Sequence, residues 1–506
     1  MSYRSVIFQD VSFAYDTATN PLLEGISTHF PQGWTGIIGA NGTGKTTLLK
    51  LATGQLFPQQ GQVNLPPHAA YCPQRTDDPP HMLEALIEDT EKSAHKIKYR
   101  LGIEEDWLLR WPTLSHGERK RAQIAAALWL QPHILAVDEP TNHLDSNARN
   151  MLAEALQSFK GIGLLVSHDR ELLDSLCQQC LFLDPPAATM RPGNYSNGFK
   201  EAQREETYRG DQRIQAKRQL SRLKREASRH REAASQARRK LSKRGLAIKD
   251  HDTRSKCDLA RLTGKNGTSG KRLRQLDGRM KHQQKKLDHI KVRKNYELGI
   301  WLPGSRATCS MLFHLTEGKI PLGSNRWLHF PEIFMRPGDR IALTGINGSG
   351  KSTLVRHIMK TLNMSKLRVT YLPQEIDCAT SKEIIHQIRS LSSQQKGHMM
   401  TIVSRLGSRP HRLLESMEPS PGEVRKILLA IGIVHEPNLI IMDEPTNHLD
   451  LPSIQCLEKA LDNCPCGLLL VSHDLYFLNR LTHIRWHIVK KTEIGEAFEL
   501  KNGCDE

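Results

Sequence analysis

Short apolar runs, each followed by a glycine-rich or acidic segment, recur in both halves of the chain. The runs at 35–38 and 340–344 lead into glycine-rich segments, and those at 134–137 and 440–442 lead into acidic pairs. Runs of this length with such boundaries are typical of buried strands. The N-terminal residues 1–8 also read as a strand. The pattern predicts an α/β fold in each half.

A helical pattern occupies the middle of the chain. Residues 201–244 contain no proline and one glycine, and their few apolar residues recur at roughly helical spacing. The spacing breaks at the glycine-rich segment 264–270, which predicts a turn, and resumes over 273–290. We therefore expect a long helical hairpin, which could reach on the order of 60–70 Å at ~1.5 Å per residue.

The two halves are copies of one domain. Residues 39–47 return in similar form at 345–353, residues 138–145 return unchanged at 443–450, and residues 165–169 return at 470–474. The offset is 306 residues at the first motif and 305 at the later ones. So constant an offset predicts two equivalent domains with only small insertions between them.

Charge separates the middle segment from the two copies. The 506-residue chain has a net charge of +17, and residues 201–295 hold 30 Lys and Arg against 11 Asp and Glu. This excess indicates a polyanionic partner, although charge runs also form solvated helical spacers. We expect a first domain at 1–198, a basic helical linker at 199–304 and a second domain at 305–506.

Membrane and secretion signals are absent from the sequence pattern. No stretch approaches the ~20 apolar residues of a membrane span, and the N-terminus lacks the apolar core of a signal peptide. We therefore expect a cytoplasmic protein without a membrane domain. The close cysteine pairs Cys177/Cys180 and Cys464/Cys466 each lack the second pair that a structural zinc site needs. Buried free thiols, with no disulfide, are expected in a reducing compartment.

Each copy carries a phosphate-binding loop, G-x-x-x-x-G-K-[ST], directly after an apolar run. Glycines let backbone N–H groups face phosphates, and the following helix presents its positive N-terminus. The lysines are expected to reach the β- and γ-phosphates of ATP, and the next hydroxyls to bind Mg²⁺. The predicted residues are Gly39, Asn41, Gly42, Gly44, Lys45, Thr46 and Thr47, then Gly345, Asn347, Gly348, Gly350, Lys351, Ser352 and Thr353.

The acidic pairs complete the predicted chemistry. An aspartate at the end of a buried strand is costly unless it meets a cation, so Asp138 and Asp443 are predicted Mg²⁺ ligands. The next strand residue points the other way, which places Glu139 and Glu444 to polarise the water that attacks the γ-phosphate. A strand-end salt bridge is the alternative for either pair taken alone.

With these motifs the chain resembles the ATP-binding-cassette (ABC) ATPases over both copies. In that family the signature loop lies 24 residues before the catalytic glutamate, as Ser115 and Ser420 do here. Tyr15 matches the aromatic that stacks on adenine, although a tyrosine after a short strand is more often a packing residue. The resemblance also assigns the Q-loops Gln74 and Gln374 (with Mg²⁺), the switch histidines His168 and His473, the D-loops Asp145 and Asp450, and the signature residues Gly117, Glu118, Gly422 and Glu423.

In this family two cassettes pair head to tail, each ATP lying between one phosphate loop and the opposite signature loop. The resemblance implies a monomer that builds this pair internally, with site one on the first phosphate loop and site two on the second. His116 replaces a signature glycine, and Pro421 removes an N–H, so site one is expected to turn over slowly. The second copy has no aromatic near Pro321, and adenine there is expected to rest on an aliphatic residue such as Ile320.

The sequence D-E-P-T-N-H-L-D in both copies resembles the ABC-F branch, tandem cassettes whose charged helical linker enters the ribosome. A basic helical linker suits RNA, because phosphates dominate RNA affinity. The resemblance implies binding at the ribosomal E site, with the linker contacting rRNA and P-site tRNA, and release on hydrolysis. Housekeeping translation, rescue of stalled ribosomes and protection from antibiotics all stay open.

Three other functions share some of these features. A soluble ATPase subunit of a membrane transporter needs a membrane partner and does not explain a basic linker. DNA-repair ATPases of this kind carry repeated C-x-x-C modules or split one cassette with a very long coiled coil, and neither pattern is in the sequence. A scaffold with inert sites is disfavoured by the intact Glu139 and Glu444.

Overall fold

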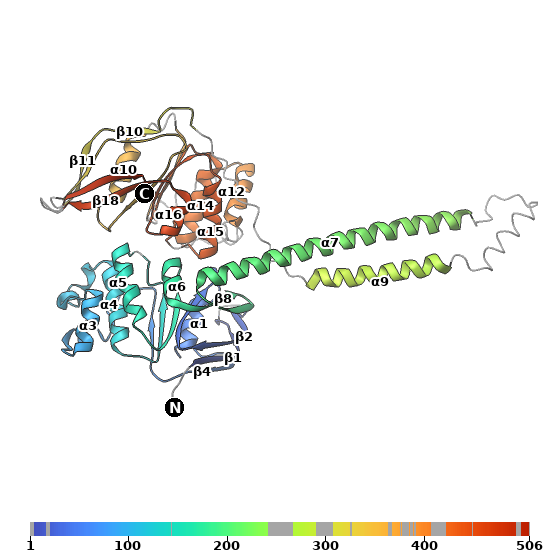
Figure 1. Cartoon of the computed structure of the whole chain (residues 1–506), viewed down its shortest axis with the longest axis horizontal. Helices are drawn as coiled ribbons and strands as arrows, with labels where there is room; N and C mark the ends of the chain where they lie inside the picture. Colours follow the sequence, from blue (N-terminus) through green and yellow to red (C-terminus); the bar gives the residue numbers. More distant parts are fainter. Residues whose placement is uncertain are drawn as a thin grey trace, which may run out of the picture. The chain divides into compact units, whose positions relative to one another are not determined.

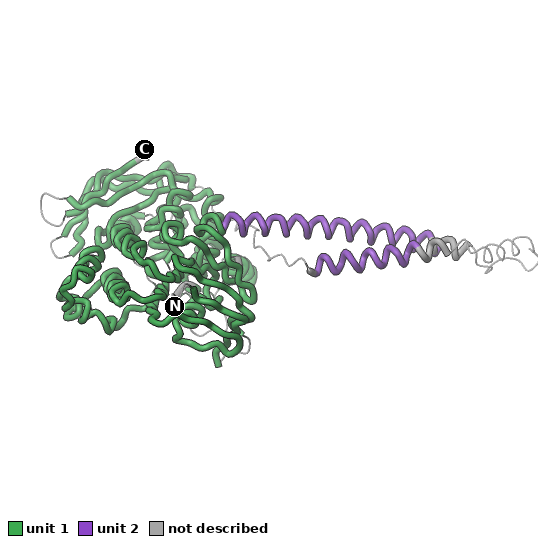
Figure 2. The backbone as a smooth tube through the Cα atoms, turned by 60° about the horizontal axis from the view of Figure 1, so that its bottom comes forward, with its two compact units in different colours: residues 1–198, 298–506 green, residues 199–297 purple. Residues whose placement is uncertain are grey.

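The structure is a computed structural model in which two compact units can be distinguished (Figure 2). Residues 1–198 and 298–506 form the first unit, and residues 199–297 form the second. The structure describes residues 5–16, 21–142, 144–240, 267–289, 307–323, 326–362, 367–374, 376, 384, 388, 391–405, 421–447, 449–491 and 497–504.

The first cassette, drawn in blue to green in Figure 1, is built on a mainly parallel sheet. Its strand β3 leads into the phosphate loop. Among the described residues its order is β5 (Ala69–Cys72), β6 (Ile134–Asp138), β7 (Ile162–Val166), β3 (Gly33–Ile38), β8 (Cys177–Asp184) and β9 (Ala187–Pro192). Only the pairing of β8 with β9 in this sheet is antiparallel. A separate antiparallel sheet consists of β2 (Leu23–Pro31), β1 (Ser5–Phe13) and β4 (Gln60–Asn64).

Helices connect and flank these strands. They are α1 (Lys45–Ala52), α2 (Leu83–Glu88), α3 (Lys92–Leu101), α4 (His116–Trp129), α5 (Ser146–Gln157) and α6 (Arg170–Leu176), with the short 3-10 turns η1 (Glu105–Trp107) and η2 (Trp111–Thr113). The predicted first strand and the predicted strands before the two motifs are confirmed as β1, β3 and β6.

The second cassette repeats this plan with its strands joined in one larger sheet. Its described order is β11 (Gly318–Gly323), β12 (Arg326–Phe330), β19 (Ala497–Cys504), β18 (Ile484–Lys491), β14 (Arg340–Gly345), β17 (Gly467–Val471), β16 (Leu439–Asp443) and β15 (Val369–Leu372). A small antiparallel pair is formed by β10 (Phe313–Leu315) and β13 (Ile333–Met335). Its helices include α10 (Lys351–Thr361), α12 (Ser393–Arg405), α14 (Pro421–Val434), α15 (Leu451–Asp462) and α16 (Leu475–Leu481).

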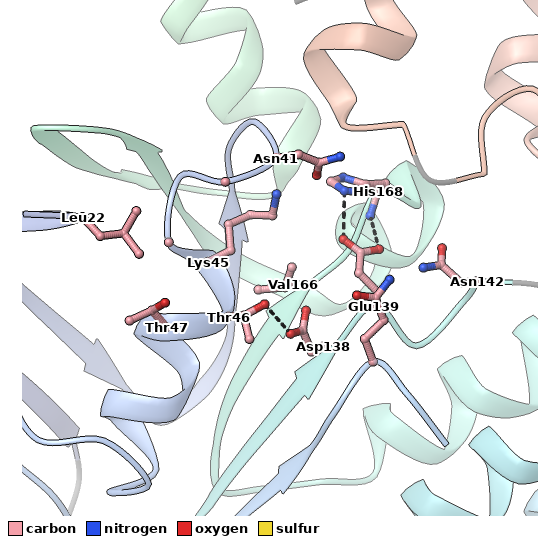
Figure 3. A pocket seen from close by; sticks show the side chains of 13 residues that line it. Leu22, Asn41, Lys45, Thr46, Thr47, Asp138, Glu139, Asn142, Val166 and His168 are labelled. Carbon is pink, nitrogen blue, oxygen red and sulfur yellow. Dashed lines mark hydrogen bonds and ion pairs between the residues drawn. The ribbon is translucent and has the colours of Figure 1, made fainter. Parts of the chain in front are cut away.

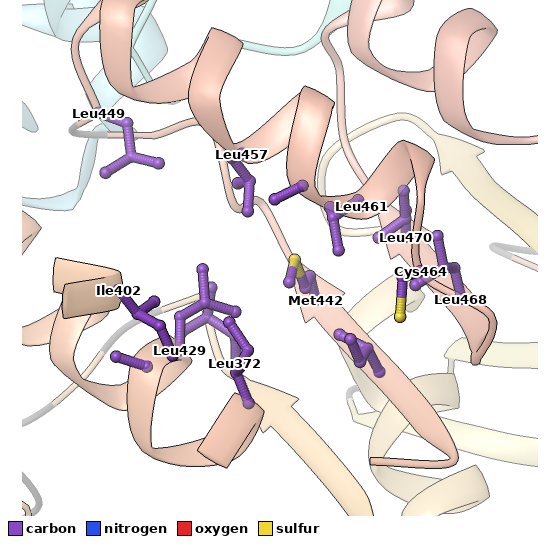
Figure 4. Packing of buried hydrophobic residues seen from close by; sticks show 14 of the residues in the cluster. Leu372, Ile402, Leu429, Met442, Leu449, Leu457, Leu461, Cys464, Leu468 and Leu470 are labelled. Atoms are coloured by element: carbon purple, nitrogen blue, oxygen red, sulfur yellow. The ribbon is translucent and has the colours of Figure 1, made fainter. Parts of the chain in front are cut away.

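Each cassette has an apolar core beside its sheet, and this core fixes where the strands end. Every residue of β6 and of β16 is buried. In the second cassette, Leu372 and Met442 from the sheet pack with Leu457 and Leu461 of α15 (Figure 4). Burial of this apolar surface stabilises the sheet at ~25 cal/mol per Å², so the polar residues that follow the buried strands are held at one edge of it.

The second unit contains two long helices that run antiparallel to each other. They are α7 (Tyr195–Lys240), whose first residues belong to the first unit, and α9 (Gly267–His289). Arg231 pairs with Asp277 at 3.1 Å, and Gln283 donates to Gln219 at 2.9 Å, so rising numbers in one helix face falling numbers in the other. Their apolar contact residues are Ala216, Leu220, Ala227 and Leu276, which are all buried.

Two expectations for this part of the chain need correction or lie outside the structure. The segment 264–270 was expected to be a turn, but α9 already begins at Gly267. The first turn of a helix tolerates glycine, serine and threonine, because its N–H groups need no partner within the helix. Residues 241–266, which include most of the expected tip, and 290–306, which include the expected linker boundary at 304, lie outside the described residues.

The cysteines follow the sequence expectation in one pair and contradict it in the other. Cys177 and Cys180 are buried free thiols, and the hydrogen bond between them and their burial raise the pKa of Cys177. Cys464 and Cys466, also expected to be free, are joined by a disulfide. The expectation of no disulfide was therefore wrong: the turn between α15 and β17 brings their Cα atoms to 5.5 Å, within the range that a disulfide can span.

Candidate functional site: two nucleotide pockets

Each phosphate loop connects a central strand to a helix through glycines in left-handed backbone. Gly42 and Gly44 have φ of +77° and +94°, and their counterparts Gly348 and Gly350 have φ of +76° and +99°. Residues other than glycine adopt such angles at a cost. The helices α1 and α10 then begin at the predicted lysines, Lys45 and Lys351.

A cavity opens in front of each loop. The first, of about 390 Å³, is shown in Figure 3. It is lined by Leu22, Asn41, Gly42, Gly44, Lys45, Thr46, Thr47, Gln74, Asp138, Glu139, Asn142, Val166 and His168. The second, of about 380 Å³, is lined by Leu144, Arg149, Leu322, Arg326, Asn347, Gly348, Gly350, Lys351, Ser352, Thr353, Gln374, Glu444, Asn447 and His473. The structure thus brings most of the predicted nucleotide residues together.

In both cavities the loop lysine bonds to carbonyls of its own loop. Lys45 Nζ donates to the Gly39 carbonyl at 2.9 Å, and Lys351 Nζ to the Gly345 carbonyl at 2.8 Å. Burial lowers the pKa of both lysines, while nearby acidic side chains oppose the shift. Each lysine therefore lies at the loop, with acidic partners close enough to favour its charge.

The predicted Mg²⁺ ligands lie together in each site. Thr46 donates its hydroxyl hydrogen bond to Asp138 at 2.7 Å (Figure 3). Burial raises the pKa of Asp138 and of Asp443, and the hydroxyls of Thr46 and Ser352 oppose that rise. Buried carboxylates with adjacent hydroxyls are hard oxygen donors that suit Mg²⁺.

The donor set in each site is small. Within the described part of the chain, no three His, Cys, Asp or Glu side chains cluster as a metal site. Mg²⁺ in nucleotide sites is usually held by one or two carboxylates together with substrate phosphates. The aspartate and hydroxyl present in each site fit that pattern.

The two predicted catalytic glutamates sit in unusual backbone. Glu139 and Glu444 have φ of +46° and +49°, and their N–H groups donate to Val166 and Val471 carbonyls, each at 2.8 Å. Strand alternation was expected to orient these side chains, but β6 ends at Asp138 and β16 ends at Asp443, one residue before each glutamate. A left-handed turn, not the alternation of a strand, directs the glutamates, and strain of this kind is frequent at functional sites.

In site one the glutamate is held by the switch histidine. His168 Nε2 lies 3.0 Å from Glu139 Oε1, and the His168 N–H donates to Oε2 at 3.2 Å (Figure 3). Burial by itself would raise the pKa of Glu139, but His168 and Lys45 outweigh it and hold that pKa below its usual value. Glu139 is therefore ionised at neutral pH.

In site two the same residues are held differently. His473 Nε2 is 3.6 Å from Glu444 Oε1 and only 3.3 Å from Lys351 Nζ. Burial, together with Lys351 and Arg149, lowers the pKa of His473 to about 3. Burial raises the pKa of Glu444 to about 7, and Lys351 and Arg149 oppose this only in part.

The D-loop aspartates connect the two cassettes. Asp450 caps α15 with one oxygen, at 2.9 Å from the Ser453 N–H, and accepts from the Asn41 N–H of the first phosphate loop at 2.7 Å with the other. Asp145 caps α5 in the same way and accepts from the Asn347 N–H at 3.4 Å. Each D-loop thus touches the phosphate loop of the other cassette.

The signature residues that the structure describes line neither cavity. Ser115 and Glu118 form a reciprocal cap at the start of α4, with Ser115 N–H donating to Glu118 at 2.7 Å. Gly117 lies against Leu144, since a Cβ built on it would approach Leu144 to 2.9 Å. Gly422 and Glu423 lie in the first turn of α14, and Ser420 lies outside the described residues. Contact of these residues with nucleotide stays a prediction.

The expected adenine contacts differ between sites. Tyr15 is 42% exposed, packs edge-on against Phe13 and bonds to the Thr47 hydroxyl at 3.0 Å, beside the first cavity. Ile320 was expected to support adenine in site two, but it is 6% exposed and belongs to the apolar core. Ile320 and Leu322 lie on the same face of β11, but Ile320 is buried in the core, and Leu322, nearer the end of the strand, lines the second cavity with Arg326.

Several site residues were missed by the sequence argument. Lys120 donates to the Asp138 carbonyl at 3.2 Å, and Arg425, at the equivalent position, donates to the Glu444 carbonyl at 2.9 Å. A basic residue at the same offset in both copies was the available signal. Arg149 of the first cassette lines the second cavity, and its counterpart Ile454 differs in character, so only a comparison of the copies could have drawn attention to it.

Comparison with known proteins gives the family. The model of the family described as ABC transporter matches residues 23–142 and again residues 331–447. Each half of the chain therefore carries a domain that matches the ABC family. Both matches include the phosphate loop and the acidic pair of one cassette, so the two ABC domains coincide with the two cavities.

Related ABC proteins share the tandem arrangement. The ribosome protection protein VmlR of Bacillus subtilis (strain 168) is 27% identical over 93% of this chain and 84% of its own length. The probable ATP-binding protein YbiT of Escherichia coli O157:H7 is 27% identical over 92% of each chain. ABC transporter F family member 4 of Arabidopsis thaliana is 27% identical over 77% of this chain and 54% of its own. One of these relatives is named an F family member, which agrees with the ABC-F resemblance of the sequence.

Solved structures agree with this fold. A structure described as RNase-L Inhibitor superposes with a TM-score of 0.63 at 19% identity, covering 97% of this chain and 90% of the other. The archaeal ribosome recycling factor aABCE1, in complex with the stalk protein aP1, gives 0.62 at 19% identity over 97% and 89%. Within the described residues, no helix is long and apolar enough to cross a membrane.

Proposed function

We propose that this chain hydrolyses ATP to ADP and phosphate, with Mg²⁺, at both cavities. The observation that carries the proposal is that each cavity is lined by a phosphate-loop lysine, a hydroxyl beside a buried aspartate, and a glutamate near a histidine. Asp138 with Thr46, and Asp443 with Ser352, would hold Mg²⁺, which would supply positive charge against the negative charge of the phosphates. Four-part sites of this kind, built twice and with no inert substitution, favour turnover over a scaffolding role.

The residues would divide the work by position. Lys45 and the loop N–H groups bind phosphates, Asp138 and Thr46 hold the metal, and Glu139 orients and deprotonates the attacking water. The equivalent set in site two is Lys351, Ser352, Asp443 and Glu444. Because the D-loop aspartates already touch the opposite loops, nucleotide binding at one loop would be sensed by the other cassette.

The signature loops would complete each site. We propose that Ser115, Gly117 and Glu118 approach site two, and Ser420, Gly422 and Glu423 approach site one, when ATP draws the cassettes together. Tyr15 would then stack on adenine in site one. Pro421, which cannot donate a hydrogen bond, would leave site one with the weaker signature contact.

We further propose that the chain acts on ribosomes in the cytoplasm. The described helices α7 and α9 expose many basic side chains, among them Lys217, Arg218, Lys224, Arg225, Arg272, Arg274, Lys281 and Lys285. One relative is named a ribosome protection protein. The proposal places the ATP-bound form at the E site, with this basic unit on rRNA and P-site tRNA; antibiotic protection is one role within it.

Turnover is tested first. Purified full-length chain should release phosphate from ATP only with Mg²⁺. The double variant Glu139→Gln/Glu444→Gln should still bind ATP but lose about 10²–10⁴-fold in kcat. Wild-type turnover by this double variant would remove both glutamates from the mechanism.

Ribosome binding is tested with the same variant. On sucrose gradients with ATP, Glu139→Gln/Glu444→Gln should sediment with ribosomes, and wild type should be released. Raising the salt from about 50 to 200 mM should weaken binding by an order of magnitude or more if the basic helices contact phosphates. Binding that ignores salt, or sedimentation only with membranes, would contradict the proposed partner.

A further inference from the structure

Arg149 touches the switch loops of both cassettes. It lies one turn into α5, four residues after the D-loop aspartate Asp145. Its Nη1 donates to the backbone carbonyl of His473 at 3.0 Å, and the same atom lies 3.6 Å from the carboxylate of Asp169. Asp169 directly follows His168. One guanidinium therefore bridges the loop that carries the switch histidine of site one and the loop that carries that of site two.

The bridge is shielded from solvent. The side chains of Arg149 and Asp169 are 18% and 10% exposed, and Arg149 Nε is buried without a hydrogen-bond partner among the described residues. Burying a charged group raises the free energy of the folded state unless hydrogen bonds and an opposite charge compensate it. Charge-assisted hydrogen bonds are about twice as strong as neutral ones, so the contact to the His473 carbonyl is a firm restraint on that loop.

The bridge exists on one side of the molecule only. The residue equivalent to Arg149 in the second cassette is Ile454, which is 1% exposed and packs in the core of its own cassette. An isoleucine cannot donate to a carbonyl or pair with a carboxylate. Site one therefore receives no corresponding arginine from the second cassette, although the surrounding motifs are repeated.

We propose that Arg149 is a positioning residue for hydrolysis at site two: it fixes the backbone at His473 and anchors it to the first cassette through Asp169. Fixing the carbonyl fixes where the imidazole stands relative to Glu444, which is 3.6 Å away. The restraint comes from the first cassette. Site two therefore hydrolyses ATP at its full rate only while Arg149 holds both switch loops in the relative position seen here. This inference rests on the proposed ATPase activity.

The test measures the two sites separately in the full-length chain. Glu139→Gln leaves site two active, and Glu444→Gln leaves site one active. In the Glu139→Gln background, Arg149→Ile, which copies Ile454, should lower kcat about tenfold with the KM for ATP changed less than about twofold. In the Glu444→Gln background, the same change should alter kcat less than about threefold. Arg149→Lys should restore part of the site-two rate, because it returns the charge without the planar fork.

A second variant tests the anchor. Asp169→Asn keeps an oxygen to cap α6 at the Leu172 N–H, a bond of 3.1 Å, but removes the charge that faces Arg149. Although Asp169 adjoins site one, this change should slow site two about threefold, and should add nothing to Arg149→Ile if the two act as one unit. Additive losses would overturn the anchoring through Asp169.

A matched control separates positioning from general loosening. Arg170 pairs with the buried Glu458 of the other cassette at 2.7 Å and lines neither cavity. Arg170→Leu should slow both sites alike, since it weakens only the contact between cassettes. Equal slowing of both sites by Arg149→Ile, or an unchanged site-two kcat, would overturn the inference.

Two outcomes concern folding and the underlying activity. If Arg149→Ile does not fold, Arg149→Gln keeps length and polarity without the charge and should give the same site-two loss. A wild-type chain without Mg²⁺-dependent turnover would overturn the proposed function, and this inference with it. A turning-over chain with a site-two rate indifferent to residue 149 would overturn this inference alone.

Discussion

The two nucleotide sites carry the same chemical groups, yet they hold the catalytic carboxylate in different states. In site one, Glu139 lies 3.0 Å from His168 and its pKa is held below the usual value. In site two, Glu444 lies 3.6 Å from His473 and its pKa is raised to about 7. A repeated motif thus fixes which groups are present, but not their protonation.

The difference comes from what surrounds each histidine. In site two Lys351 Nζ is 3.3 Å from the imidazole, and Arg149 reaches in from the other cassette. These two cations, with burial, keep His473 neutral, so it cannot form an ion pair with Glu444. With its pKa raised to about 7, Glu444 is partly protonated at neutral pH, whereas the lowered pKa of Glu139 leaves that carboxylate ionised.

The largest expected effect is the loss of one site at a time. Glu139→Gln and Glu444→Gln should each abolish turnover at their own site, by about 10²–10⁴-fold. The Glu444→Gln variant leaves only site one active and should retain the larger share of wild-type phosphate release at pH 7. The reason is that partial protonation of Glu444 in site two should cost more than the weak signature contact of Pro421 costs in site one. Greater residual activity in Glu139→Gln would mean that the signature loops, and not the carboxylates, set the ranking.

The next effect is pH dependence confined to one site. Glu444 must be ionised to accept a proton, and its pKa of about 7 lies within the assay range. In Glu139→Gln, kcat/KM should therefore fall about tenfold from pH 8 to pH 6, as the free enzyme gains a proton. In Glu444→Gln, which reports site one, it should stay flat over that range. The same fall in kcat/KM from pH 8 to pH 6 in both variants would contradict the proposed difference between Glu139 and Glu444.

A smaller effect is expected from adenine contacts. Tyr15→Ala should raise the KM for ATP about fivefold in the Glu444→Gln background, because an aromatic pair contributes ~1 kcal/mol. Tyr15→Phe keeps the ring and is the control. In the Glu139→Gln background neither change should matter. A similar rise at both sites would show that Tyr15 acts through packing of the cassette.

The smallest effect is expected at the D-loops. Asparagine can still cap a helix and still offers an oxygen to the Asn41 N–H, so Asp450→Asn would lose only part of the ~1.5–3 kcal/mol that a hydrogen bond to a charged group contributes. ATP affinity at site one should fall about threefold to fivefold, measured with a fluorescent nucleotide. Asp145→Asn affects a bond of 3.4 Å and should change site two less. The reverse order would mean that the cassettes close differently with ATP.

Sequence spacing predicted the local parts of these sites well. The phosphate loops, the strand before each acidic pair and the grouping of Lys45, Asp138 and His168 follow from motifs whose geometry is local or set by one sheet. The strands β3 and β14 begin or end within two residues of the predicted runs. Each of these motifs occurs in both copies, so each prediction could be made independently in the two cassettes.

The remaining features depend on residues far apart in the chain. Arg149 and His473 are 324 positions apart, and no pattern in either segment announces their contact. Ile320 was misplaced because the position at which β11 leaves the core and meets the cavity is not marked in the sequence: Leu322, on the same face of the strand, lines the cavity. The Cys464–Cys466 disulfide was missed because the distance between two cysteines this close in sequence depends on the backbone of the turn that joins α15 to β17. The sequence does not give that conformation.

The left-handed backbone at Glu139 and Glu444 has a consequence for what these positions can accept. A β-branched side chain such as valine or isoleucine is far more strained at φ near +46° than asparagine or glycine, which visit that region readily. Among variants that still fold, asparagine and glycine should therefore be over-represented at both positions. A cassette that loses its catalytic activity by substitution at this position should therefore most readily acquire asparagine or glycine, because these residues relieve the backbone strain in the turn that directs the carboxylate.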